Sequence, residues 1–124
     1  MLKEISAGRQ QIGDLTRRWF ADESFDLFIF VDENGTLLQL QLSYDKTHQE
    51  HIISWAANSG YTHNRVDDGQ DISGKARSPI MVPDGVCDID RIISSFRNSS
   101  DALDDELFDA VYRKLIGFKH NIDF

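Results

Sequence analysis

Residues with chemically reactive or ligand-binding side chains gather in one stretch of this 124-residue chain. The stretch combines two aromatic rings, an imidazole, a guanidinium and two carboxylates: Trp55, Tyr61, His63, Arg65, Asp67 and Asp68. Such a mixture beside a long glycine-containing segment is typical of a ligand cleft. His63 with Asp67 or Asp68 is the candidate acid/base pair. The structural alternative places Trp55 in the core, Tyr61 in a cross-strand pair and Arg65 in ion pairs with the aspartates.

Residues 69–76 match most of a nucleotide-binding phosphate loop. Gly69, Gly74 and Lys75 have the required spacing, but Ala76 stands where the motif needs a serine or threonine hydroxyl for Mg²⁺. A helix must also start at this point, and Pro79 disfavours one. We interpret the match as coincidental.

The remaining chemical motifs are weak. The four histidines, at positions 48, 51, 63 and 120, do not have the spacing of a metal site. The acidic residues at 67–71 lack the alternating ligands and the final glutamate of a calcium loop. Cys87 is the single cysteine, so no intrachain disulfide can form, and no basic residue beside it indicates a reactive thiolate. We therefore predict no catalytic residue, no metal site and no cofactor.

The charge balance is acidic, with a net charge of −8. Residues 84–109 contribute most of it, because they hold eight acidic and two basic residues. Such a field repels phosphate groups, so binding to nucleic acid is disfavoured. The acidic segment is either an ordinary solvated surface or a docking surface for a basic protein.

Composition predicts a globular protein made of one domain, residues 1–124. The first fourteen residues lack the apolar region of a signal peptide, and no apolar run is long enough to span a membrane. Together with the single cysteine, these features predict a cytoplasmic location without membrane attachment.

Residues 25–44 organise the chain, because two apolar runs flank Asn34 and Gly35. Asn-Gly favours a type I′ hairpin turn, since both residues tolerate positive φ. A two-residue turn would pair Val31 with Leu38 and Ile29 with Leu40. The alternation then defines an aliphatic face, which we call face A: Leu27, Ile29, Val31, Leu38, Leu40 and Leu42.

The opposite face, face B, mixes aromatic and polar residues: Phe28, Phe30, Gln39 and Gln41. Their expected neighbours on the next strands are Ser54 and Thr62. A central strand rarely leaves two phenylalanines to water, so either the N-terminal strand covers face B or this surface forms an interface, for instance in a homodimer.

Other segments complete the predicted fold. Residues 15–21, 51–57 and 61–66 read as strands, 79–82 as a possible short edge strand, and 1–14 as ambiguous. Trp55 should lie on face A, opposite His63. Residues 89–96 and 103–115 have apolar stripes at helical spacing, with Asp88 as an N-cap and Gly117 as a C-cap. The prediction is an α+β fold: an antiparallel meander of about five strands followed by two C-terminal helices packed on face A.

These features favour a small cytoplasmic binding or interaction module without catalytic activity, either dimeric through face B or docking a basic protein. The alternative function is a small enzyme or ligand-binding domain that uses a cleft around Trp55, His63 and Asp67 or Asp68. An enzyme needs an acid/base pair held at a fixed geometry, and the sequence does not specify that geometry.

Overall fold

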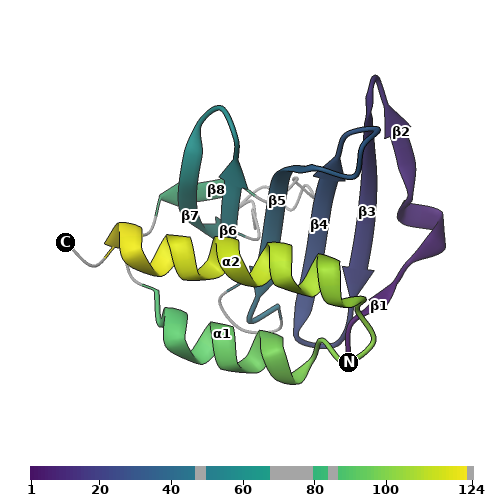
Figure 1. The fold of residues 1–124 in the computed structure, drawn as a ribbon. Helices are drawn as coiled ribbons and strands as arrows, with labels where there is room; N and C mark the ends of the chain where they lie inside the picture. The colour runs from purple at the N-terminus through teal and green to yellow at the C-terminus, as the bar shows by residue number, and fades with distance from the viewer. Residues whose placement is uncertain (47–49, 68–79, 84–86, 123–124) are drawn as a thin grey trace, which may run out of the picture.

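The computed structural model describes residues 1–46, 50–67, 80–83 and 87–122, which form an antiparallel sheet followed by two helices (Figure 1). The strands are β1 (Lys3–Glu4), β2 (Gln10–Ile12), β3 (Leu15–Ala21), β4 (Phe25–Val31), β5 (Leu37–Tyr44), β6 (His51–Ala56), β7 (Gly60–Asp67) and β8 (Ile80–Pro83). A 3-10 turn, η1 (Ser6–Gly8), separates β1 from β2, and the helices are α1 (Ile89–Asn98) and α2 (Asp105–Ile122). The predicted α+β class is confirmed.

Within the described residues the sheet has eight strands, whereas the sequence predicted about five and a possible short edge strand. The strand order is β1-β3-β4-β5-β6-β7-β8, and β2 pairs with β3. Short strands β1 and β2 pair with opposite ends of β3, and their sparse apolar residues explain why residues 1–14 gave no clear signal. Strand β8 corresponds to the predicted edge strand and pairs with β7.

The central hairpin has the predicted register over most of its length. Leu27 pairs with Leu42, and Ile29 pairs with Leu40. These four residues are at most 1% exposed. The prediction that they share a buried face is therefore confirmed, and strict aliphatic alternation was a sufficient signal.

The turn of this hairpin differs from the predicted type I′ geometry. Gly35 has a positive φ of 81°, whereas Asn34 does not, and the amide of Thr36 donates to the side chain of Asp32. The register shifts between Phe30 and Val31, so that Val31 pairs with Leu37 instead of Leu38. This bulge compensates for the odd length of the loop and keeps the rest of face A in register.

The second hairpin has the predicted faces but a different register. Leu40 pairs with Trp55 and Leu42 with Ile53, which places Trp55 on face A as predicted. Trp55 lies opposite Tyr61, however, and not opposite His63. The turn ends one residue earlier than expected, because Gly60 begins β7 and pairs with Ala56.

The helices follow their apolar stripes, with one change at the end. Asp88 caps α1, since its side chain accepts a hydrogen bond from the amide of Arg91. Asp104 caps α2 in the same way, with the Leu107 amide 2.8 Å away. The predicted C-cap at Gly117 is wrong, because α2 continues past it to Ile122.

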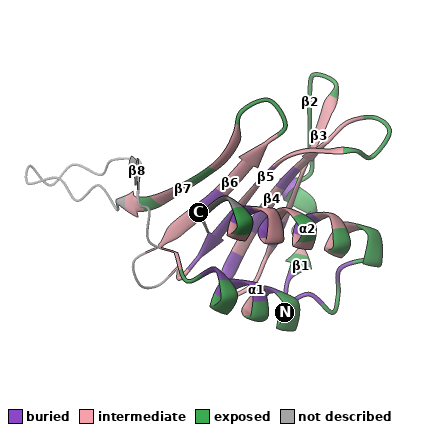
Figure 2. Cartoon of the chain, turned by 60° about the vertical axis from the view of Figure 1, so that its left-hand side comes forward, coloured by how far each residue is buried: buried purple, intermediate pink, exposed green. Residues whose placement is uncertain are grey.

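Both helices lie on the same side of the sheet (Figure 1). Ring contacts join the two layers: Phe96 of α1 meets Phe25 edge-on at 6.3 Å, and Phe118 of α2 meets Tyr61 at 5.8 Å between ring centroids. Figure 2 shows that buried residues occupy the middle of the sheet and the inner helix surfaces, while the hairpin tips are exposed. The buried residues form one hydrophobic cluster.

The bulge makes a testable distinction between two neighbouring leucines. Leu40 is 1% exposed in the core, whereas Leu38 is only partly buried and lies outside the core cluster. We expect Leu40→Ala to lower the free energy of unfolding by ~2–5 kcal/mol, since it leaves a cavity. Leu38→Ala, the matched control, should lower it by about 1 kcal/mol or less. Urea denaturation of both variants checks this, and equal losses would place Leu38 back on face A.

Candidate functional site

The structure brings three of the six predicted site residues onto one surface. Trp55, Tyr61 and His63 lie on the helix-facing side of β6 and β7, and all three are partly buried. Arg65 is exposed and pairs with His51 across the strands. Asp67 ends β7, and Asp68 lies outside the described residues. The predicted pairing of His63 with either aspartate stays a prediction.

The C-terminal half of α2 covers these aromatic side chains. The Phe118 ring lies 5.8 Å from Tyr61 and 5.9 Å from His63. Lys114 Nζ lies 3.9 Å above the centre of the Trp55 ring, a cation–π contact. Gly117 faces the hydroxyl of Tyr61 so closely that a Cβ at this position would clash with it. The three side chains thus contribute to the packing of α2 on the sheet.

His63 also belongs to a stack of polar rings that the sequence did not predict. The rings of Tyr44, His51 and His63 are nearly parallel, with centroids 5.2 to 5.9 Å apart. The Tyr44 hydroxyl lies 2.5 Å from Nε2 of His63 and 3.6 Å from the sulfur of Cys87. Cross-strand pairing of Tyr44 with His51 is the feature that assembles the stack.

Burial keeps Tyr44 protonated. Desolvation, together with the hydrogen bond to Cys87, raises the pKa of the Tyr44 hydroxyl far above its ordinary value. A phenol in this state donates hydrogen bonds and does not act as a base at neutral pH. The stack therefore holds a protonated Tyr44 hydroxyl beside His63. No group of three potential metal ligands exists within the described part of the chain.

Three surface hollows are lined by described residues. The largest has a volume of about 280 Å³ and lies where α1 ends and α2 begins; we call it the α1–α2 hollow. A second, of about 210 Å³, lies between α2 and the β4–β5 hairpin, and the third, of about 70 Å³, lies beside Tyr44 and Arg91. All three are smaller than the ~300–1,000 Å³ typical of small-molecule sites.

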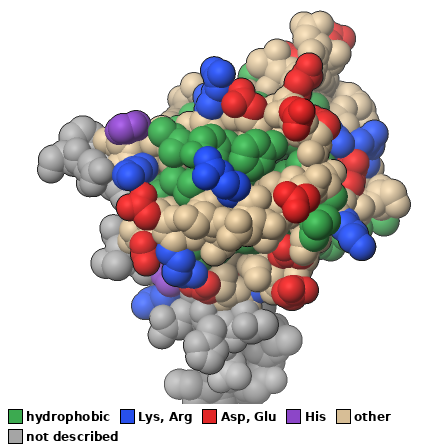
Figure 3. All heavy atoms as spheres, turned by 60° about the horizontal axis from the view of Figure 1, so that its bottom comes forward, with side chains coloured by type: hydrophobic (Ala, Val, Ile, Leu, Met, Phe, Trp, Pro, Cys, Tyr) green, Lys and Arg blue, Asp and Glu red, His purple; other side chains and the backbone are tan. Residues whose placement is uncertain are grey.

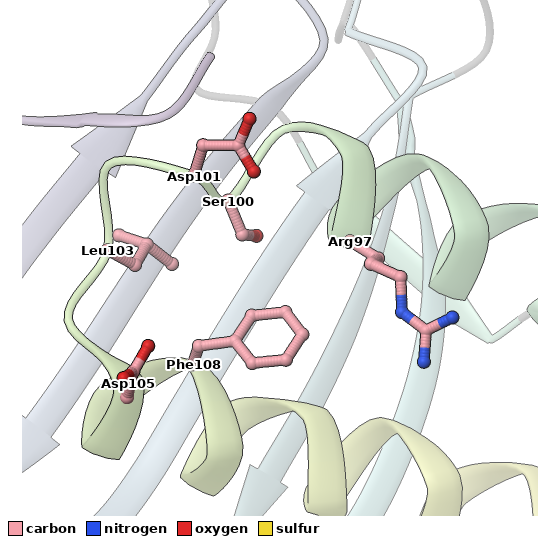
Figure 4. Close-up of a pocket in the computed structure, with 6 residues that line it drawn as sticks. All are labelled: Arg97, Ser100, Asp101, Leu103, Asp105 and Phe108. Carbon is pink, nitrogen blue, oxygen red and sulfur yellow. The ribbon is translucent and has the colours of Figure 1, made fainter.

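The α1–α2 hollow combines apolar, acidic and basic side chains (Figure 4). Its lining consists of Arg97, Ser100, Asp101, Leu103, Asp105 and Phe108. Ser100 and Leu103 are buried, while Asp101 and Asp105 are exposed at the rim. The sequence identified the acidic segment but not the hollow. The hollow depends on how the end of α1 and the start of α2 lie relative to one another.

The acidic residues of the helical layer fall into two groups. Three of these carboxylates are paired: Asp88 with Arg91, Asp90 with Lys119, and Asp109 with Arg113. By contrast, Asp101, Asp104, Asp105 and Glu106 form no ion pair with any described residue. Figure 3 shows acidic and basic side chains around an apolar patch on this side of the molecule. The carboxylates without an ion pair gather at the start of α2, which we call the negative pole.

Face B lies on the side of the sheet opposite the helices. Phe28 stacks on Trp19 at 5.6 Å, and the Arg17 guanidinium lies 5.6 Å from the centre of the Phe28 ring. Gly8 of η1 packs on Trp19, since a Cβ there would lie 2.7 Å from the Trp19 Cβ. Phe28, Phe30, Gln39 and Gln41 are all partly buried, and Phe28 pairs with Gln41 as predicted.

Comparison with known proteins gives no further identification: no family model, curated protein or solved structure matches the chain. No helix among the described residues is long and apolar enough to cross a membrane. Function must therefore be inferred from the surfaces themselves.

The contact of Gly117 with Tyr61 predicts that a Gly→Ala substitution at this helix position destabilises the protein, which is the opposite of its usual effect. Gly→Ala inside a helix normally stabilises by ~0.5–1 kcal/mol. Gly117→Ala should instead lower the melting temperature, because the new methyl group clashes with the Tyr61 hydroxyl. In a Tyr61→Phe background, where the hydroxyl is gone, the same substitution should become neutral or stabilising. Stabilisation by Gly117→Ala in the wild-type background would contradict this packing.

The dimer interface through face B stays a prediction, and a double substitution tests it. If face B forms the interface, wild-type protein should be dimeric, and Phe28→Ser with Phe30→Ser should give a folded monomer, because serine removes the apolar surface of face B. The stacking of Trp19 on Phe28 is the contact expected of the alternative, in which the N-terminal strand covers face B and the protein is monomeric. Light scattering gives the mass and circular dichroism the fold. A monomeric wild type whose double variant unfolds would mean that both rings belong to the core.

Proposed function

We propose that this chain is a small binding module that docks a basic protein and performs no chemistry of its own. The observation that carries the proposal is the group of exposed carboxylates without an ion pair at the start of α2, beside a hollow that also presents the apolar side chains of Leu103 and Phe108. Charge of one sign next to apolar surface attracts a partner of the opposite sign and gives it area to bury.

A structural role explains only part of this acidic group. Asp104 caps α2, and Asp105 and Glu106 lie in its first turn, where carboxylates stabilise the helix dipole. Asp101 precedes the helix and has neither role. Its exposed carboxylate therefore stays available to a basic partner.

The alternative function, an enzyme or ligand-binding domain, has weaker support. Its residues Trp55, Tyr61 and His63 are engaged with α2, and His63 also contacts Tyr44. Packing of this kind uses the groups that a substrate would need to reach. The proposed module retains the predicted cytoplasmic location and the absence of nucleic-acid and membrane partners.

Neutralising the negative pole tests the proposal. The probe is a fluorescent decapeptide of alternating arginine and glycine, and its citrulline counterpart is the uncharged control. Binding measured by anisotropy at low salt should weaken about two- to thirtyfold in Asp101→Asn with Asp105→Asn, since each exposed ion pair contributes ~0.2–1 kcal/mol. Added salt should weaken wild-type binding as well.

The matched control removes the same total charge elsewhere. Asp90→Asn with Asp109→Asn changes two exposed carboxylates that are already paired with Lys119 and Arg113. This variant should bind the arginine peptide within about twofold of wild type, because its carboxylates are not available to a partner. Equal weakening in both variants, or equal binding of the citrulline peptide, would overturn the proposal.

A further inference from the structure

The α1–α2 hollow is built on a well-ordered connection between the two helices. The Ser100 hydroxyl hydrogen-bonds to the carbonyl of Phe96, and the Leu103 amide donates to the carbonyl of Ser100 at 3.0 Å. The N-terminal segment adds a third bond, from the Leu2 amide to the Ser99 carbonyl at 2.7 Å. These bonds fix the backbone that carries the rim, so little ordering is needed on binding.

The hollow offers two kinds of contact to one long side chain. Leu103 and Phe108 supply apolar surface, and the carboxylates of Asp101 and Asp105 stand on its rim (Figure 4). A side chain with an aliphatic stem and a cationic head matches both. Arginine fits better than lysine, because its planar guanidinium pairs with carboxylates through two hydrogen bonds and is weakly hydrated.

An arginine of this chain already lies on the adjoining apolar surface. The guanidinium of Arg97 lies 5.3 Å from the centre of the Tyr112 ring and donates to the Tyr112 hydroxyl at 3.2 Å. Tyr112 in turn stacks on Phe108, with 5.4 Å between the ring centroids. The surface around the hollow therefore accommodates a guanidinium, while the charge of Arg97 opposes a second one nearby.

We infer that the α1–α2 hollow binds an arginine side chain presented by the basic partner, with its stem against Phe108 and its guanidinium between Asp101 and Asp105. This inference rests on the proposed function, which it makes specific by naming the side chain and its place of binding. Arg97 then limits the affinity, because it is the basic residue that lines the hollow.

Nuclear magnetic resonance titration tests the place and the chemistry. The probes are Nα-acetyl-arginine amide and the corresponding lysine and citrulline amides, added to ¹⁵N-labelled protein. Arginine amide should shift the amide signals of Ser100, Leu103 and Phe108 most strongly. The lysine amide should bind more weakly, and the citrulline amide should cause little change.

Removing Arg97 should strengthen binding, a result that damage to the fold would not produce. We expect Arg97→Gln to bind arginine amide about two- to fivefold more tightly than wild type, the range expected from one exposed charge. Arg113→Gln is the matched control, because it changes the net charge equally but lies outside the hollow. Its affinity should stay within about twofold of wild type.

The outcomes separate this inference from the proposed function. If arginine amide shifts signals elsewhere, or if Arg97→Gln and Arg113→Gln behave alike, the hollow is not the arginine site, even when the arginine decapeptide still binds. If the decapeptide does not bind either, the proposed function fails as well. Unchanged affinity in Arg97→Gln would also overturn the inference.

Discussion

Burial of face A is the constraint on which the rest of the structure depends. Strands β4 to β6 present a row of aliphatic side chains that are almost fully excluded from water, among them Leu27, Leu42 and Ile53. A sheet face of this kind must be covered, and two amphipathic helices do so from one side. Each buried leucine contributes on the order of 1.5–3 kcal/mol, so covering this face decides where the helices lie.

The position of α2 in turn decides what the polar residues of β6 and β7 can do. Its C-terminal half places Phe118 against His63 and Tyr61, and Gly117 lets the backbone approach the Tyr61 hydroxyl. Three residues that the sequence assigned to a candidate ligand cleft, Trp55, Tyr61 and His63, thereby contribute to the packing of α2. The other end of α2 lies at the edge of the helical layer, where carboxylates remain exposed.

Much of the fold could be predicted because alternation and helical spacing are local signals. They identified the strand pairs around Leu27 and Ile29, the face of Trp55 and the stripe of α1. They could not identify the bulge near Leu38, because it arises from the length of the turn. Nor could they show that Gly117 lies inside a helix, because a glycine is needed there for contact with Tyr61, which lies on a strand distant in the sequence.

The candidate site was harder to predict than the fold for a related reason. Acidic residues near the start of a helix commonly cap it. The sequence alone therefore could not show that Asp104 caps α2 and that Asp101 does not. Only the structure shows which carboxylates form ion pairs and which border the α1–α2 hollow. Asp101 lies outside the first turn of α2, where the helix dipole loses its effect, so neither capping nor the dipole accounts for its position beside the hollow. A cationic side chain placed between Asp101 and Asp105 would be attracted by both carboxylates, and that attraction is strongest where apolar neighbours such as Phe108 exclude water.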